Sequence, residues 1–512
     1  MKLLVYSFSL TCKLLALHSH VMARKRFMQL QPIGAASATE WDEDRANVEV
    51  RVDLNNFLNG CDLNQEYFLD GLDQYKTKRT KYLRTPSQLI IVFAKILDSK
   101  LGKNLQGKTR NRVYKKMVDM TDAVNATWIS MESFVEGKSM RGWPLKVDET
   151  KDQETVIPEF EAYHGGHAME AMARAAKQIA LHGEHQKAAS LVFSSASAIY
   201  DGFITDDLER TKLNDKGVVV YVPVGASDER VKRYKKIHPN WICLEQPQAT
   251  NHGLSVAFAA SALLKACKAI DWTVADWTLV DGDGTPIKQK FFLAKLEKFV
   301  KDSYDFLSTQ FIRRETSNDD SYQGDNGTPY YIWRYRDYSQ CPEKKDYRHN
   351  RLQDTAHLET EIMFVSEISD LGHELHGNRN YYGQTKKHIR YIIVSMLAKI
   401  VLDRSKFGAS RFACGLNGRN NPTSVACKGR RSIRRIMNHI PNILTPAITA
   451  WEYDSKNDCD VLNLVNDVLP FYLDESKKVE RFCRYPQESW ALLEAKFYYY
   501  WYDTGRKSLG CL

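Results

Sequence analysis

Hydrophobic side chains recur at helical spacing along most of the chain. The clearest stretch is 385–404, where the aliphatic residues fall on one stripe with a period of 3.6 residues. Weaker stretches with this period predict further helices at 85–101, 110–134, 167–182, 185–200, 252–270, 291–309, 357–371, 431–439, 461–472 and 487–501. Strand-like alternation is scarce, and its best candidate is the β-branched run 217–223. The pattern predicts a mainly α-helical protein.

The predicted helices show no fixed sequence repeat of the kind found in helical arrays. The chain also lacks the glycine patterns of Rossmann and Walker nucleotide sites. We therefore expect one large helical domain over 24–505, and a closed ring of helical hairpins, an (α/α) toroid, suits this length. Polar stretches at 310–356 and 405–430 are predicted to be long loops, which in compact domains are often functional.

The first 23 residues resemble a signal peptide. Lys2 precedes a mostly apolar stretch, and Val21 and Ala23 have the spacing of a cleavage site. A mitochondrial-type or disordered leader is the alternative, because no acidic residue occurs before Glu40. The sequence predicts secretion of a mature chain that begins near residue 24.

Cysteine usage is compatible with an oxidising compartment. The chain holds 10 cysteines, of which nine remain once Cys12 is removed with the leader. No C-x-x-C pair occurs, which argues against a zinc ribbon or a thioredoxin-type site. Cys414 with Cys427, and Cys459 with Cys483, are the candidate disulfide pairs.

Composition narrows the class of partner. The chain has 512 residues with 43% hydrophobic and 26% charged side chains, which excludes a largely disordered protein. After the N-terminus no apolar run is long enough to span a membrane. The net charge, 72 − 63 = +9, favours an anionic partner. Lys and Arg are scattered rather than striped, so we expect neither nucleic acid nor a membrane as that partner.

The first candidate motif is a histidine pair around two glycines. Tyr163, His164 and His167 stand at the predicted opening of a helix, where the two histidines could share a face. A polar edge of this kind could bind a sugar. The alternative is a Gly-Gly hinge between two polar caps.

The second motif is Asn251-His252, directly before an apolar helix. A helix N-terminus favours anions, so these side chains could hold and polarise a carboxylate. The alternative is that Thr250 or Asn251 simply caps the helix.

The third motif is the aromatic and arginine-rich run 330–338. Aromatic faces stack on sugar rings and arginine binds carboxylates in bidentate geometry. We assign substrate contact or chemistry to Tyr331, Trp333, Arg334, Tyr335, Arg336 and Tyr338. The alternative is an edge strand.

The fourth motif begins the helix predicted at 357–371. Asp354 or Thr355 would cap it, and His357 and Glu361 stand one turn apart on one face. A histidine oriented by a carboxylate suits a general base. The alternative is a capped helix with a surface histidine.

His373 and His376 form an H-x-x-H pair without visible further ligands. A polar helix end is the better interpretation. We predict no metal site and no cofactor.

The order of these motifs over 155–405 resembles that of the helical toroid polysaccharide lyases, which include alginate lyases and glucuronan lyases. The resemblance implies β-elimination on an anionic polysaccharide of uronic acids, without a required metal. It implies that Asn251 and Arg336 hold the carboxylate. His252 or His357 would then remove the ring proton, and Tyr335 would protonate the leaving oxygen.

Two other functions stay open. A glycoside hydrolase on the same fold would need two carboxylates about 5–10 Å apart. Asp354, Glu359 and Glu361 are candidates for one of them, and Asp337 for the other. The third possibility is a carbohydrate-binding protein without catalysis.

Overall fold

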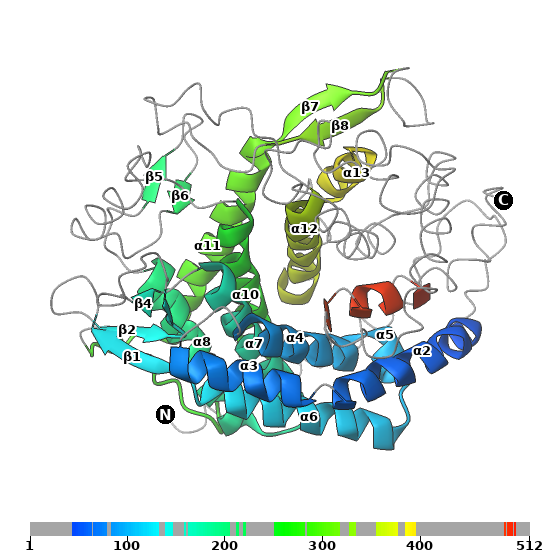
Figure 1. Ribbon diagram of the computed structural model, residues 1–512. Coiled ribbons are helices and arrows are strands. Elements are labelled where there is room, and N and C mark those ends of the chain that lie inside the picture. Colours follow the sequence, from blue (N-terminus) through cyan, green and yellow to red (C-terminus); the bar gives the residue numbers. More distant parts are fainter. Residues whose placement is uncertain are drawn as a thin grey trace, which may run out of the picture. The chain divides into compact units, whose positions relative to one another are not determined.

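The computed structural model describes residues 43–63, 65–78, 83–132, 139–146, 158–159, 162–204, 211–213, 219–221, 250–281, 284–317, 327–333, 355–376, 385–395, 486–487, 489–494 and 496–497. All of them belong to the unit Asp42–Leu512. This part of the chain is mainly helical, as the periodicity predicts (Figure 1). Its helices are α2 (Glu43–Leu63), α3 (Gln65–Lys78), α4 (Arg84–Asp98), α5 (Lys100–Lys103), α6 (Gly107–Asn125), α7 (Ala162–Leu181), α8 (His185–Ile199), the π-helix η3 (Tyr200–Ile204), α10 (Thr250–Ala269), α11 (Gln289–Gln310), α12 (Thr355–His376) and α13 (Thr385–Ser395).

The described strands form four two-stranded antiparallel hairpins. They pair β1 (Ile129–Glu132) with β2 (Ser139–Gly142), β3 (Leu145–Lys146) with β4 (Pro158–Glu159), β5 (Thr211–Leu213) with β6 (Val219–Tyr221), and β7 (Ile312–Glu315) with β8 (Pro329–Ile332). In the last hairpin Ile312 lies opposite Ile332 and Glu315 opposite Pro329. The strand expected at 217–223 is confirmed as β6.

Four helices that are not consecutive in sequence pack in series: α4 on α7, α7 on α10, and α10 on α12. The pairing of α7 with α10 is the most extensive in the described part of the chain. Both helices are rich in alanine and are apolar on nearly every side, the pattern of a helix buried all round. At Gly166 a Cβ atom would stand 2.8 Å from the backbone of Ser255, so glycine allows the closest approach.

Helices α4 and α7 run in the same direction. The guanidinium of Arg84 lies over the ring of Tyr163 near the start of both helices. Near their ends, Lys177 Nζ bonds Asp98 Oδ2 at 2.9 Å. Both contacts have the same sequence offset, since 163 − 84 = 79 and 177 − 98 = 79. An equal offset requires parallel helices in one register.

Helices α10 and α12 are also parallel. The rings of Phe258 and Phe364 meet at 5.5 Å between centroids, and Lys268 Nζ donates to the carbonyl oxygen of Glu374. The offset is again constant, since 364 − 258 = 106 and 374 − 268 = 106. The four helices of the series therefore run in the same direction, provided that α7 and α10 are also parallel to each other.

The contacts between α7 and α10 meet that condition. Near the starts of these helices Gly166 faces Ser255, an offset of 89. Further along, Lys177 and Lys265 both bind Glu374, an offset of 88. Helices α4, α7, α10 and α12 thus begin at one common end.

The helices that follow α7 and α10 return against them. Gly183, with φ of 87°, turns the chain from α7 into α8, and positive φ is a conformation that glycine adopts without a Cβ penalty. After α10, Trp272 Nε1 donates to Cys267 O, and the ring of Trp277 meets that of Phe292 in the first turn of α11. Each turn therefore places the start of the next helix at the end of the previous one.

One buried ion pair joins the first hairpin to the helices. Arg141 of β2 donates to both carboxylate oxygens of Asp201 in η3, at 2.6 and 2.9 Å. The same guanidinium reaches the carbonyl oxygen of Val280 at 2.6 Å. Burial raises the pKa of Asp201, and the pairing with Arg141 opposes that effect. This fork fixes three segments that are far apart in sequence.

Two expected helices are wrong at their ends. The helix predicted at 85–101 stops at Asp98, and the Ser99 Oγ atom accepts the N–H of Gly102 to start α5. The helix predicted at 110–134 ends at Asn125, and β1 follows from Ile129. Capping by Ser99 and strand pairing therefore override the apolar period at these two positions.

The sequence pattern did not predict the N-terminal helices α2 and α3. Their apolar residues meet α4 and the C-terminal segment 486–497, where Gln88 bonds Gln487 and Lys496 Nζ bonds Asp53 at 2.6 Å. The described residues of that segment are helical, in line with the prediction for 487–501. The helices predicted at 431–439 and 461–472, the loop 405–430, and the cysteine pairs lie outside the described residues.

Candidate functional site

The first turns of the four parallel helices lie at one level. The ring contact sets Arg84 beside Tyr163, and the offset of 89 sets Tyr163 level with position 252 along the two helices. The offset of 106 then sets position 252 beside 358, next to His357. The fold therefore gathers the described parts of three of the four sequence motifs, 162–168, 250–254 and 355–361, at one end of the helix series.

The motif on α7 is a compact ring cluster. The ring of Tyr163 meets those of His164 and His167 edge-on, at 5.3 and 4.9 Å between centroids. Arg84 lies over the same tyrosine at 4.8 Å. His167 is buried and its Nδ1 lies 2.6 Å from the Tyr163 carbonyl oxygen. Because a carbonyl can only accept, Nδ1 carries the proton and fixes the ring.

The expected hinge at Gly165-Gly166 is absent, because α7 starts at Ala162 and runs through both glycines. The two histidines therefore stand within one helix and share its face. Gly166 instead gives α7 its close contact with α10 at Ser255.

Asn251 and His252 lie in the first turn of α10, which begins at Thr250. His357 lies in the first turn of α12, which begins at Thr355. The N–H groups of a helix's first turn have no partner within the helix and carry partial positive charge. Several parallel helices that begin at one level therefore favour a negatively charged ligand there.

The aromatic side chains in the described part of the third motif are buried. Tyr331 stacks on Phe311 at 4.7 Å, and its N–H donates to Ser395 Oγ at 2.9 Å. Trp333 is fully buried. The expectation that Tyr331 and Trp333 stack on a substrate is therefore corrected: both pack inside the protein, as the edge-strand alternative predicts. Arg334, Tyr335, Arg336 and Tyr338 lie outside the described residues.

Glu361 is also corrected as a substrate contact. It is 0% exposed, and Glu359 on the same helix is buried as well. At the offset of 106, Glu361 stands level with Ser255, inside the helix packing below the candidate site. A carboxylate in that place can act on neighbouring side chains rather than on a polymer.

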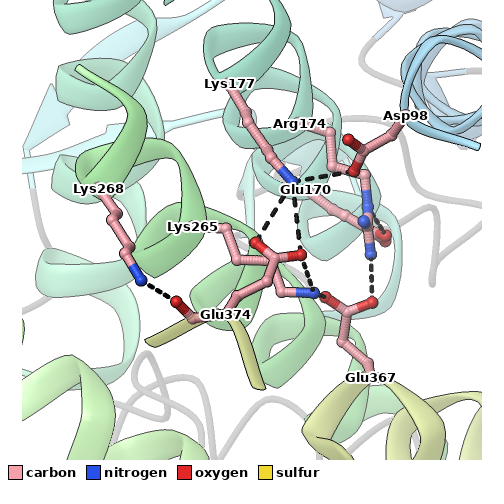
Figure 2. A network of polar contacts seen from close by, with 8 residues as sticks. All are labelled: Asp98, Glu170, Arg174, Lys177, Lys265, Lys268, Glu367 and Glu374. Carbon is pink, nitrogen blue, oxygen red and sulfur yellow. Dashed lines mark hydrogen bonds and ion pairs between the residues drawn. The ribbon is translucent and has the colours of Figure 1, made fainter. Parts of the chain in front are cut away.

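The sequence motifs missed the most connected polar group of the described chain, an ion network in the C-terminal halves of the same helices. Figure 2 shows its side chains converging from α4, α7, α10 and α12. Arg174 binds Glu170 at 2.7 Å and Glu367 at 2.9 Å. Lys265 binds Glu367 at 3.0 Å and Glu374 at 3.4 Å. Lys177 completes the network through Asp98 and Glu374.

The acidic and basic side chains of the network keep one another ionised. Burial alone would raise the pKa of Glu367, but Arg174 and Lys265 outweigh it and hold that pKa well below its ordinary value. Burial alone would lower the pKa of Lys265, and Glu367 and Glu374 outweigh it in the opposite direction. The network thus joins the four helices α4, α7, α10 and α12 through paired ions.

A sequence signal for this network exists. Glu170, Arg174 and Lys177 follow one another at four and three residues in an alanine-rich helix, and Glu367 and Glu374 are seven apart. Charged residues that share one face of an otherwise apolar helix indicate buried pairing, since unpaired charges are seldom buried. His388, which accepts or donates at 2.9 Å with the Tyr304 hydroxyl, is a second buried polar contact that no motif indicated.

Comparison with protein-family models, curated proteins and solved structures found no match for this chain. None of the described helices is both long and apolar enough to cross a membrane. Within the described ranges, no three His, Cys, Asp or Glu side chains gather as a metal site.

Proposed function

We propose that the protein is a polysaccharide lyase that cleaves a polymer of uronic acids by β-elimination at the common N-terminal end of α4, α7, α10 and α12. The observation that carries the proposal is the register of these helices. Contacts elsewhere along them bring the starts of three motif-bearing helices to one level, although the motifs are separated by about ninety residues or more.

The chemistry of this end suits the first step of β-elimination. The carboxylate of a uronic acid must be neutralised before the neighbouring ring proton becomes acidic enough to remove. Helix N-termini, Arg84 and Asn251 supply positive potential and hydrogen-bond donors for that carboxylate. In this mechanism Arg336 assists in holding the same group.

Proton transfer needs a base and an acid in the same place. His252 or His357 serves as the base, because histidine is the side chain whose ordinary pKa lies nearest neutrality. Tyr335 serves as the acid that protonates the leaving oxygen. A tyrosine hydroxyl is protonated at neutral pH and can donate to a developing alkoxide.

The proposed architecture is an (α/α) toroid. In such a fold alternate helices form an inner parallel layer and the helices between them return outside it. The series α4, α7, α10, α12, with α8 and α11 returning against α7 and α10, supports this arrangement.

The decisive assay exposes the mature protein to alginate, glucuronan, pectate and glycosaminoglycans and follows ultraviolet absorbance. A lyase leaves an unsaturated end that absorbs, so absorbance should rise with at least one acidic polymer. New reducing ends without absorbance would identify a hydrolase instead. Binding without either product would identify a carbohydrate-binding protein.

A further inference from the structure

A small pocket opens within the ion network, between the C-terminal halves of α4, α7 and α10. Its polar lining consists of Lys95, Asp98, Arg174, Lys177, Gln178 and Lys265. Four of these six side chains are cations. The pocket lies about 16 Å along α7 from the candidate lyase site, since Arg174 is 11 residues beyond Tyr163 and a helix rises about 1.5 Å per residue.

Three of the four cations already have carboxylate partners in direct contact. Arg174 binds Glu170 and Glu367, and Lys177 binds Asp98 and Glu374. Lys265 binds Glu367 and Glu374.

The fourth cation, Lys95, makes no ion pair and no side-chain hydrogen bond with any residue in the described part of the chain. Burial lowers its pKa and the charge of Arg174 lowers it further, while Glu170, Glu494 and Glu367 oppose this from a distance. Burial raises the pKa of Glu494 to about 7, which leaves that carboxyl largely uncharged below neutral pH. Lys95 therefore faces the pocket with an unmet need for negative charge.

Gln178 is the second group that points to a ligand. It is 2% exposed and lines the pocket, yet its side-chain amide has no hydrogen-bond partner among the described residues. An acceptor in the pocket would satisfy its N–H groups and the ammonium of Lys95 together.

The size of the pocket selects the ligand. Its enclosed space holds little more than one water molecule, which favours a small anion over phosphate, sulfate or a carboxylic acid. Asp98 is exposed and Lys177 partly exposed, so small ions can enter from solvent. We propose that this pocket binds one halide-sized monovalent anion, chloride in nature, between the ammonium of Lys95 and the amide of Gln178. The ion ties α4 to α7 and supplements the network that joins α7 to α10 and α12.

The test compares sodium chloride with sodium gluconate at equal ionic strength on the full chain. Gluconate is too large for the pocket, so screening is matched and only site binding differs. The temperature of unfolding should rise with chloride along a saturating curve, above the gluconate baseline. Lys95→Met and Gln178→Ala should each weaken chloride binding at least about tenfold, the equivalent of one lost charge-assisted or buried hydrogen bond. Lys187→Met, which removes a lysine outside the pocket, should keep the wild-type response.

A crystal of the unaltered protein soaked in bromide gives a second measurement, which does not depend on the folding of any variant. An anomalous peak between Lys95 and Gln178 is the expected result. Equal responses to chloride and gluconate, a chloride response that Lys95→Met leaves intact, or a pocket without bromide would each overturn the proposal in favour of a bound water.

Discussion

The guanidinium carbon of Arg84 lies 4.8 Å from the centre of the Tyr163 ring, which joins the first turns of α4 and α7. This contact stands at the level of positions 252 and 357, where the substrate carboxylate is proposed to bind.

Arg84→Ala should therefore weaken polyuronate turnover. The loss of one charge-assisted hydrogen bond, about 1.5–3 kcal/mol, corresponds to a drop in kcat/KM of roughly ten- to 150-fold. The measurement is initial rate against substrate concentration at several salt concentrations, and the wild-type KM should rise with salt as charges are screened. Arg112→Ala, a partly exposed arginine on α6, is the control and should change little. An Arg84 variant with wild-type rates and salt dependence would remove this residue from the site.

Replacement of a histidine at a helix start, His252 or His357, is predicted to affect turnover far more than replacement of His373 near a helix end. His252→Ala or His357→Ala, whichever removes the base, should lower turnover by about 10²–10⁴-fold, and Tyr335→Phe should do likewise. His373→Ala lies near the other end of α12 and should cost little. Circular dichroism should show that all variants keep the helical fold.

The opposite pattern would contradict the lyase mechanism. If those three variants keep near-normal rates while Asp354→Asn or Asp337→Asn is inactive, a carboxylate-pair hydrolase takes its place.

Gly165 and Gly166 are predicted to respond in opposite directions to alanine. A Cβ at Gly166 would stand 2.8 Å from the Ser255 backbone, so Gly166→Ala forces α7 from α10 and should destabilise the protein by about 1–3 kcal/mol. At Gly165 the nearest atom is the Met169 methyl at 3.5 Å, an ordinary contact. Gly165→Ala should be neutral or stabilising by up to about 1 kcal/mol, because alanine favours helix. Urea unfolding measures both, and equal effects would contradict the close approach.

Glu367→Gln should destabilise the fold by about 3–5 kcal/mol, because it leaves Arg174 and Lys265 buried with an uncompensated charge. The wild-type contribution has a defined pH dependence. Since the folded state lowers the pKa of Glu367 from 4.5, its stabilisation is complete above that value and is lost as pH falls further. Unfolding free energies at a series of pH values should show this loss in the wild type and not in the variant. Glu374→Gln, on a half-exposed side chain, should cost less than about 1 kcal/mol.

Secretion predicts a processed chain with oxidised cysteines. Cys61 is disulfide-bonded, whereas Cys267 is a buried free thiol. Disulfides form mainly in oxidising compartments, so the mature protein should begin near residue 24 and Cys61 should resist alkylation until reduced. N-terminal sequencing and mass spectrometry after alkylation check both points. An intact Met1 on the protein recovered from its native compartment would exclude the predicted leader.

Much of the local structure could be predicted from the sequence. The 3.6-residue period located α7, α8, α10, α11 and α12 within a few residues, because burial of an apolar stripe requires that period whatever the partner is. It missed the break at Ser99, where a single side-chain cap competes with the period. It also gave no expectation for α2 and α3, whose mixed sequences are helical where α3 packs on α4 and α2 packs on α3.

Some features of the candidate site could likewise be proposed from the sequence, and others could not. Sequence alone proposed His164, His167, Asn251, His252 and His357 as site residues, by residue type and by their places before or within helices. It assigned Tyr331, Trp333 and Glu361 to a substrate, since a run of aromatic or acidic residues does not reveal which face is covered. Only the tertiary structure decided that these three are buried, that Arg84 stands at the level of the site, and that Lys95 has no ion-pair partner among the described residues. Register between helices, burial and charge pairing are properties of neighbours distant in the chain, and such neighbours exist only once the helices have packed.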